Sequence, residues 1–190
     1  MSTGLIITLV VVGIIVLIVA IIAGMYNSLV KLNERVEEAW SDITIQLKRR
    51  ADMLPNLVET VKGYAKHEKE IFEHCADARA KMMGARTVQS VADADRSMLG
   101  ALSRIMAVAE NYPALQANDN FKKLMSEISD TEDKVSASRR FYNAGAKDLN
   151  TRIKIFPINL FHGFGFKERE YYNVDEKEFE RVEKAPEVKF

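Results

Sequence analysis

The chain has 190 residues, of which 47% are hydrophobic and 28% are charged, and its formal net charge is zero at pH 7. This balance gives no global electrostatic bias toward nucleic acid or toward anionic lipid, so nucleic acid is not expected as a partner. The single cysteine, Cys75, cannot form an internal disulfide and suits a reducing compartment.

Residues 4–25 form an apolar run in which Thr8 is the only polar side chain. A helix needs about 20 apolar residues to cross the hydrocarbon core of a bilayer, so the sequence predicts a transmembrane anchor over residues 1–25. A cleavable secretory signal would carry a basic N-terminal region and a shorter apolar core, and neither is present. Because ion pathways and transport sites need polar groups inside the membrane, we expect an anchor and no channel or transporter.

Basic residues follow the apolar run: Lys31 and Arg35, and then the cluster at 48–50. Lys and Arg close to a span favour the cytoplasmic side of the membrane. We therefore predict a single-pass protein whose C-terminal part lies in the cytoplasm.

The remaining 160 or so residues carry a helical pattern and no alternating, strand-like one. Apolar residues recur every three or four positions over residues 29–51, 54–82, 91–109 and 121–149. The fourth run alternates strictly between steps of three and four, which is a heptad pattern and favours helices packed at shallow angles. Its seam consists of Phe121, Leu124, Ile128, Thr131, Val135, Ser138, Tyr142, Gly145 and Leu149.

Breaks between these runs fall at Pro55, at Gly84 and at Asn111–Pro113, and Thr87 is a candidate helix cap. Pro55 suits the first turn of a helix. The sequence therefore predicts an all-α protein: a single N-terminal transmembrane helix followed by an antiparallel four-helix bundle over residues 26–150. The alternative is that Pro55 only kinks one very long helix, which would leave three helices.

Residues 151–172 form an aromatic-rich segment without helical period, and residues 173–190 form a charged tail. One interpretation is that the apolar side chains of the segment pack along the bundle and close its end: Ile153, Ile155, Phe156, Ile158, Leu160 and Phe161. The other is that Phe161, Phe164 and Phe166 form an exposed patch that contacts lipid or a partner, since exposed apolar patches usually bind something.

Lys48, Arg49 and Arg50 form the one local basic cluster. On a helix that rises straight from the bilayer they would lie some tens of ångströms from it, beyond a Debye length of about 8 Å. They could pair with acidic residues of a neighbouring subunit or partner. The alternative is a solvated cluster that complements the C-terminus of a helix.

Catalytic and metal-binding patterns are missing from the sequence. His67 and His74 are seven residues apart, too far for one metal ion, and Glu-x-x-His does not occur. Cys75 lies on an apolar helix face, where a free thiol behaves as a small hydrophobic residue. We expect neither an enzyme nor a bound cofactor or metal.

Several motifs resemble the LemA family of bacterial membrane proteins. They are Tyr26-Asn27-x-Leu29-Val30, Arg35 to Glu70, Ala109-Glu110-Asn111-Tyr112-Pro113-x-Leu115, Arg139-Arg140-Phe141-Tyr142-Asn143, Phe156-Pro157-x-Asn159, Gly165-Phe166-Lys167 and Pro186-x-Val188-x-Phe190. The resemblance implies a membrane-anchored antiparallel helical bundle with no known enzymatic activity and no established ligand. It also implies a link to stress-response membrane proteases and to magnetosome membranes.

Two functions are therefore expected. The first is a non-catalytic scaffold in the bacterial inner membrane that forms homo-oligomers, aided by small seam residues at Thr131, Ser138 and Gly145 that permit close approach. The second is an adaptor or regulator of another membrane protein, such as a stress-response protease. A ligand sensor that uses a cavity in the bundle is a third, and no residue identifies its ligand.

Overall fold

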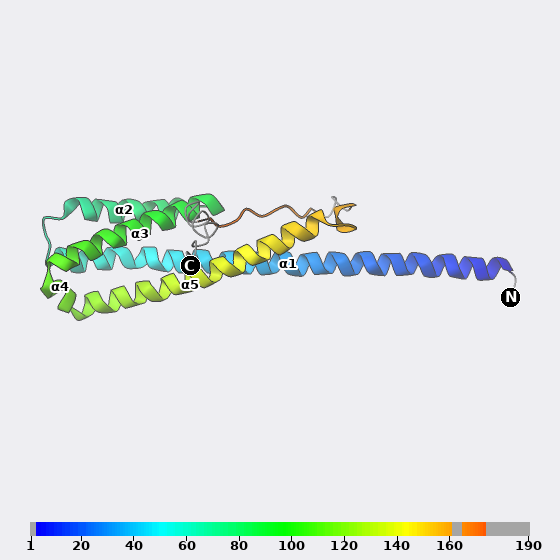
Figure 1. Cartoon of the computed structure of the whole chain (residues 1–190), viewed down its shortest axis with the longest axis horizontal. Coiled ribbons are helices and arrows are strands. Elements are labelled where there is room, and N and C mark those ends of the chain that lie inside the picture. The colour runs from blue at the N-terminus through cyan, green and yellow to red at the C-terminus, as the bar shows by residue number, and fades with distance from the viewer. Residues whose placement is uncertain (1–2, 161–164, 174–190) are drawn as a thin grey trace, which may run out of the picture. The chain divides into compact units, whose positions relative to one another are not determined.

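The computed structural model describes residues 3–160 and 165–173, and within these ranges the chain is helical and has no strand (Figure 1). The all-α prediction, with one long apolar N-terminal helix, is confirmed. The elements are α1 (Thr3–Lys62), α2 (Lys69–Gly84), α3 (Val88–Asn111), α4 (Pro113–Ala117), α5 (Asp119–Lys154) and a 3-10 turn at Ile158–Leu160.

The described residues divide into two compact units. The first unit comprises residues 3–38, 143–160 and 165–169, and we call it the membrane-proximal unit because it contains the predicted anchor. The second, the bundle unit, comprises residues 39–142 and 170–173. Both α1 and α5 contribute to each unit. Of the expected charged tail only Asn173 lies in the described ranges.

The predicted helix break at Pro55 is wrong, because α1 continues through Pro55 to Lys62. Pro55 itself is exposed, whereas Leu54 and Leu57 on either side of it are at most 1% exposed. Burial of these leucines favours the helical path despite the backbone hydrogen bond that proline cannot donate. The chain turns instead at Gly63, where the amides of Tyr64 and Ala65 both donate to the carbonyl of Val61 at 2.9 Å.

Four long helices result all the same, namely α1, α2, α3 and α5. The alternative of three helices assumed that a continuous α1 would absorb the second run, but only its first part joins α1 and the rest forms α2. In the bundle unit the successive long helices run in alternating directions, and α2 and α3 lie side by side (Figure 1).

The start of α3 is fixed by a capping box, as the position of Thr87 predicted. The amide of Ser90 donates to Thr87 Oγ1 at 3.1 Å, and the amide of Thr87 donates to Ser90 Oγ at 2.9 Å. Each side chain thus satisfies a backbone amide that has no partner within the helix. The predicted breaks at Gly84 and Asn111–Pro113 are also confirmed, since α2 ends at Gly84 and α4 begins at Pro113.

The core of the bundle unit contains several residues of the predicted heptad seam of α5, whose last two residues, Gly145 and Leu149, belong to the membrane-proximal unit. Phe121, Ile128 and Val135 are at most 4% exposed, and they share this core with residues such as Leu47 and Met98. Cys75 is also buried, and this burial raises the pKa of its thiol to about 11, so the thiol stays neutral.

In the membrane-proximal unit, α5 packs closely against α1 at Gly145. A Cβ atom at Gly145 would lie 3.0 Å from Val36 Cγ2, whereas one at Gly100 on the exposed side of α3 would meet nothing within 4 Å. The small seam residue at 145 therefore serves a contact within the chain.

Leucine at these two glycines should have opposite effects on stability. Gly145→Leu should lower the free energy of unfolding by about 1–3 kcal/mol, because the side chain overpacks a filled contact. Gly100→Leu should raise it by about 0.5 kcal/mol, because leucine favours a helix more than glycine does. Urea unfolding of the detergent-solubilised protein, followed by circular dichroism, measures both; equal effects would show that Gly145 is not a close contact.

Candidate functional site

The six residues that the sequence proposed as an interaction surface have different surroundings. Phe161 and Phe164 lie outside the described residues. Phe166 is partly exposed, and its ring packs on that of Tyr26 with centroids 5.9 Å apart. Lys48 and Arg49 are exposed, so their part in an interaction surface stays a prediction.

Arg50 does not share the exposed surface of its two neighbours, because it is only 1% exposed. Its Nη1 donates to Asp95 Oδ1 at 2.9 Å, and its Nε donates to Thr131 Oγ1 at 3.3 Å. These contacts join α1, α3 and α5 inside the bundle unit. The expectation of a three-residue basic surface is therefore corrected to two residues.

Helical spacing carried a signal for this burial. Arg50 lies three residues after Leu47 and four before Leu54, on the apolar face of α1. Asp95 lies in the same way on the buried face of α3, three residues before Met98. Opposite charges on the apolar faces of two helices predict a buried pair, since a lone buried charge is unstable.

Tyr172 closes the other side of Asp95. Its hydroxyl donates to Asp95 Oδ2 at 3.1 Å, and its ring lies 5.7 Å from the guanidinium carbon of Arg139. The Trp40 ring packs against Tyr172 at 6.5 Å and against Tyr142 at 5.5 Å. We call Arg50, Asp95, Thr131, Arg139 and Tyr172 the buried polar cluster.

Burial controls the ionisation of this cluster. It raises the pKa of Asp95, while the Arg50 charge, the Tyr172 hydrogen bond and the Arg139 charge act in the lowering direction. Burial and the Asp95 carboxylate together raise the pKa of Tyr172, so its hydroxyl keeps its proton and remains a donor. Arg50 and Asp95 are each 1% exposed, and their ion pair connects elements of the bundle.

The membrane-proximal unit carries a pocket of about 580 Å³ beside the end of the apolar run. One side is a face of α1 and the other is the segment 165–169, in which Gly165 has a left-handed φ of 76°. The lining residues are Tyr26, Val30, Asn33, Glu34, Gly165, Phe166, Lys167, Glu168 and Arg169.

Arg169 fixes this segment to both helices of its unit. Its Nη2 donates to Asn33 Oδ1 at 2.9 Å and also pairs with Glu37. Its backbone exchanges two hydrogen bonds with the Asn150 side chain, at 2.8 and 2.9 Å. Lys154 Nζ adds an ion pair with Glu168 Oε2 at 2.8 Å. The pocket lining thus carries both signs of charge and two aromatic rings, which suits binding of an amphipathic group more than catalysis.

No group of three or more His, Cys, Asp or Glu side chains within the described ranges is placed to hold a metal ion. Among the residues that the structure describes, one helix, α1, is long and apolar enough to cross a membrane.

Comparison with known proteins gives the family. The sequence profile of the LemA family matches residues 39–190. The chain belongs to the LemA family. The match begins inside the first long motif that suggested this family and covers all the later ones.

Curated relatives extend this LemA assignment. Magnetosome protein MamQ 2 of Paramagnetospirillum magneticum is 30% identical, with 82% of this chain and 68% of that protein covered. Magnetosome protein MamQ of Magnetospirillum gryphiswaldense is 28% identical, with 78% and 64% covered. Protein LemA of Metamycoplasma hominis is 26% identical, with 84% and 73% covered. None of these names denotes an enzyme, and with the apolar helix they indicate a membrane-associated LemA protein.

Removal of the buried carboxylate charge should destabilise this LemA chain strongly. Asp95→Asn leaves the Arg50 charge buried without a counterion, so the free energy of unfolding should fall by about 3 kcal/mol or more in urea titrations. The matched control is Asp93→Asn, two residues away, which loses an exposed pair with Arg96 and should change stability by about 0.5 kcal/mol or less. Equal effects of the two substitutions would contradict a structural role for the cluster.

Proposed function

We propose that this LemA-family protein is a non-catalytic, membrane-anchored scaffold of the bacterial inner membrane that assembles with copies of itself. The proposal places the bundle unit in the cytoplasm, supported by Lys31 and Arg35 directly after the apolar run. Two relatives are named as magnetosome proteins, and neither name denotes an enzyme, which supports a non-catalytic role.

Two of the three small seam residues of α5 make contacts within the chain, whereas Ser138 is partly exposed, so we propose an assembly surface outside the seam. Thr131 is 0% exposed and accepts a hydrogen bond from Arg50, and Gly145 meets Val36. These two small residues therefore permit close packing inside one copy and leave no room for a second.

Phe141 carries the self-assembly proposal. It lies on α5 with 74% of its surface exposed, next to the exposed Arg140 and one turn after Ala137. An aromatic ring with an arginine beside it is the composition typical of interface hot spots. In a two-fold pair the same patch serves both copies, so a single phenylalanine near the axis contributes twice.

The exposed Lys48 and Arg49 and the three phenylalanines Phe161, Phe164 and Phe166 remain a proposed interaction surface. The second candidate function is an adaptor or regulator of a membrane partner such as a stress-response protease, and it would use the same residues to bind that partner in place of a second copy.

Phe141→Glu should reduce the assembly to its monomer, because a carboxylate at the contact would be desolvated without a partner. Native mass measurement after gentle solubilisation should show multiples of 21.5 kDa for the unaltered chain and the single mass for the variant. Met106→Glu, at an apolar residue of α3 that is 43% exposed, is the control and should leave the multiples intact. A single mass for the unaltered chain at all concentrations would contradict self-assembly.

The two functions differ in what a crosslinker at position 141 captures in the native membrane. A photo-reactive residue replacing Phe141 should yield a product of two identical chains. Products that contain only a different membrane protein would overturn the scaffold proposal and favour the adaptor.

A further inference from the structure

Two apolar side chains project from the membrane-proximal unit where α5 ends. Ile155 is 50% exposed and Phe156 is 76% exposed, so they do not close the end of the bundle as one interpretation of the sequence expected. The amide of Asn159 donates to the Ile155 carbonyl at 3.0 Å, so the chain turns directly after them. We call Ile155 and Phe156 the apolar tip.

The level of this tip along α1 follows from two contacts. Gly145 lies against Val36, and Arg152 Nη1 donates to Ser28 Oγ at 2.9 Å. The seven residues of α5 from 145 to 152 thus lie beside the eight residues of α1 from 36 back to 28, as in an antiparallel pair of helices. Continuing two residues from Arg152 to Lys154, where α5 ends, reaches the level of residue 26, since 28 minus 2 is 26. The tip therefore follows α5 beside the end of the apolar run, which closes at Met25, and Figure 1 shows the end of α5 next to α1.

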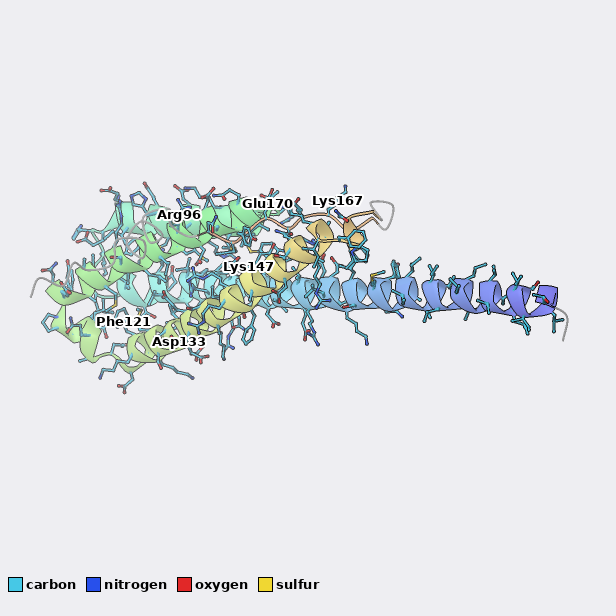
Figure 2. All side chains as sticks on the ribbon, turned by 45° about the vertical axis from the view of Figure 1, so that its right-hand side comes forward. Arg96, Phe121, Asp133, Lys147, Lys167 and Glu170 are labelled. Carbon is cyan, nitrogen blue, oxygen red and sulfur yellow. The ribbon has the colours of Figure 1, made fainter. Side chains whose placement is uncertain are left out.

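The surroundings of the tip match a membrane interface. Tyr26, 40% exposed, lies where aromatic belts occur at the edge of the hydrocarbon. The basic residues Arg152 and Lys154 come directly before the tip, and Lys167 lies on the segment that returns toward α1 (Figure 2). Apolar side chains with basic side chains next to them are typical of elements that lie in the headgroup region.

We propose that the apolar tip inserts into the boundary between headgroups and acyl chains of the bilayer that α1 crosses, and so forms a second lipid contact. This proposal rests on anchoring by α1 and does not require self-assembly. We name the bilayer as the partner of the tip because the register of α5 against α1 places the tip beside the end of the apolar run. Because α1 already holds the tip there, insertion is intramolecular and needs little intrinsic affinity.

A fluorescent depth probe tests the insertion directly. The full chain, with Cys75→Ala, carries an environment-sensitive fluorophore on Phe156→Cys and is reconstituted in phosphatidylcholine vesicles that contain lipids brominated at shallow or deep positions. Two matched variants carry the same probe. Lys147→Cys lies on α5, nine residues before the tip, and Leu17→Cys lies within the apolar run (Figure 2).

The fluorescence emission of the probe at position 156 should shift to the blue. Shallow bromines should quench this emission several-fold more than the emission of the probe at position 147. The probe at position 147 should respond only to a water-soluble quencher. The probe at position 17 should be quenched by deep bromines. If position 17 responds and position 156 behaves like position 147, the tip proposal is overturned while the anchor stands. If position 17 fails to respond, the anchor fails and the tip proposal with it.

Discussion

Exposure of the apolar run of α1 is the constraint on which the membrane-proximal unit depends. Fourteen Leu, Ile and Val side chains between Leu5 and Ile21 are each at least 47% exposed. Burying them in hydrocarbon is worth on the order of 10 kcal/mol or more. Under the proposed anchoring the membrane interface lies near Tyr26. The contacts of Arg152 and Arg169 hold the end of α5 and the following segment beside this part of α1.

The bundle unit, in contrast, is organised around a buried pair of charged side chains. Arg50 and Asp95 are both 1% exposed, and desolvating such a pair can cost more than the attraction returns. Hydrogen bonds from Arg50 to Thr131 and from Tyr172 to Asp95 satisfy more of the buried polar atoms. The pair therefore joins three helices and the segment around Tyr172 in one arrangement. This is a structural use of charge, and it agrees with a scaffold better than with an enzyme.

Local signals in the sequence predicted the local features. The apolar run, the Thr87 cap, the break at Pro113 and the buried seam of α5 follow from composition, capping chemistry and periodicity. Tertiary packing decided the rest. Burial of Leu54 and Leu57 carries α1 through Pro55, and Arg50 follows its helix face and not its basic neighbours. The pocket and the apolar tip depend on the register of α5 against α1, which no pattern within either segment specifies.

The level of the membrane on α1 is the central claim, and a nitroxide scan measures it directly. A spin label moved residue by residue from position 17 to position 35 of the reconstituted chain reports collisions with oxygen, which enriches in hydrocarbon, and with a water-soluble nickel chelate. We predict oxygen-dominated collisions up to Met25 and nickel-dominated collisions from Lys31 onward. Nickel-dominated collisions at every position, or oxygen-dominated collisions that persist beyond Lys31, would contradict the account.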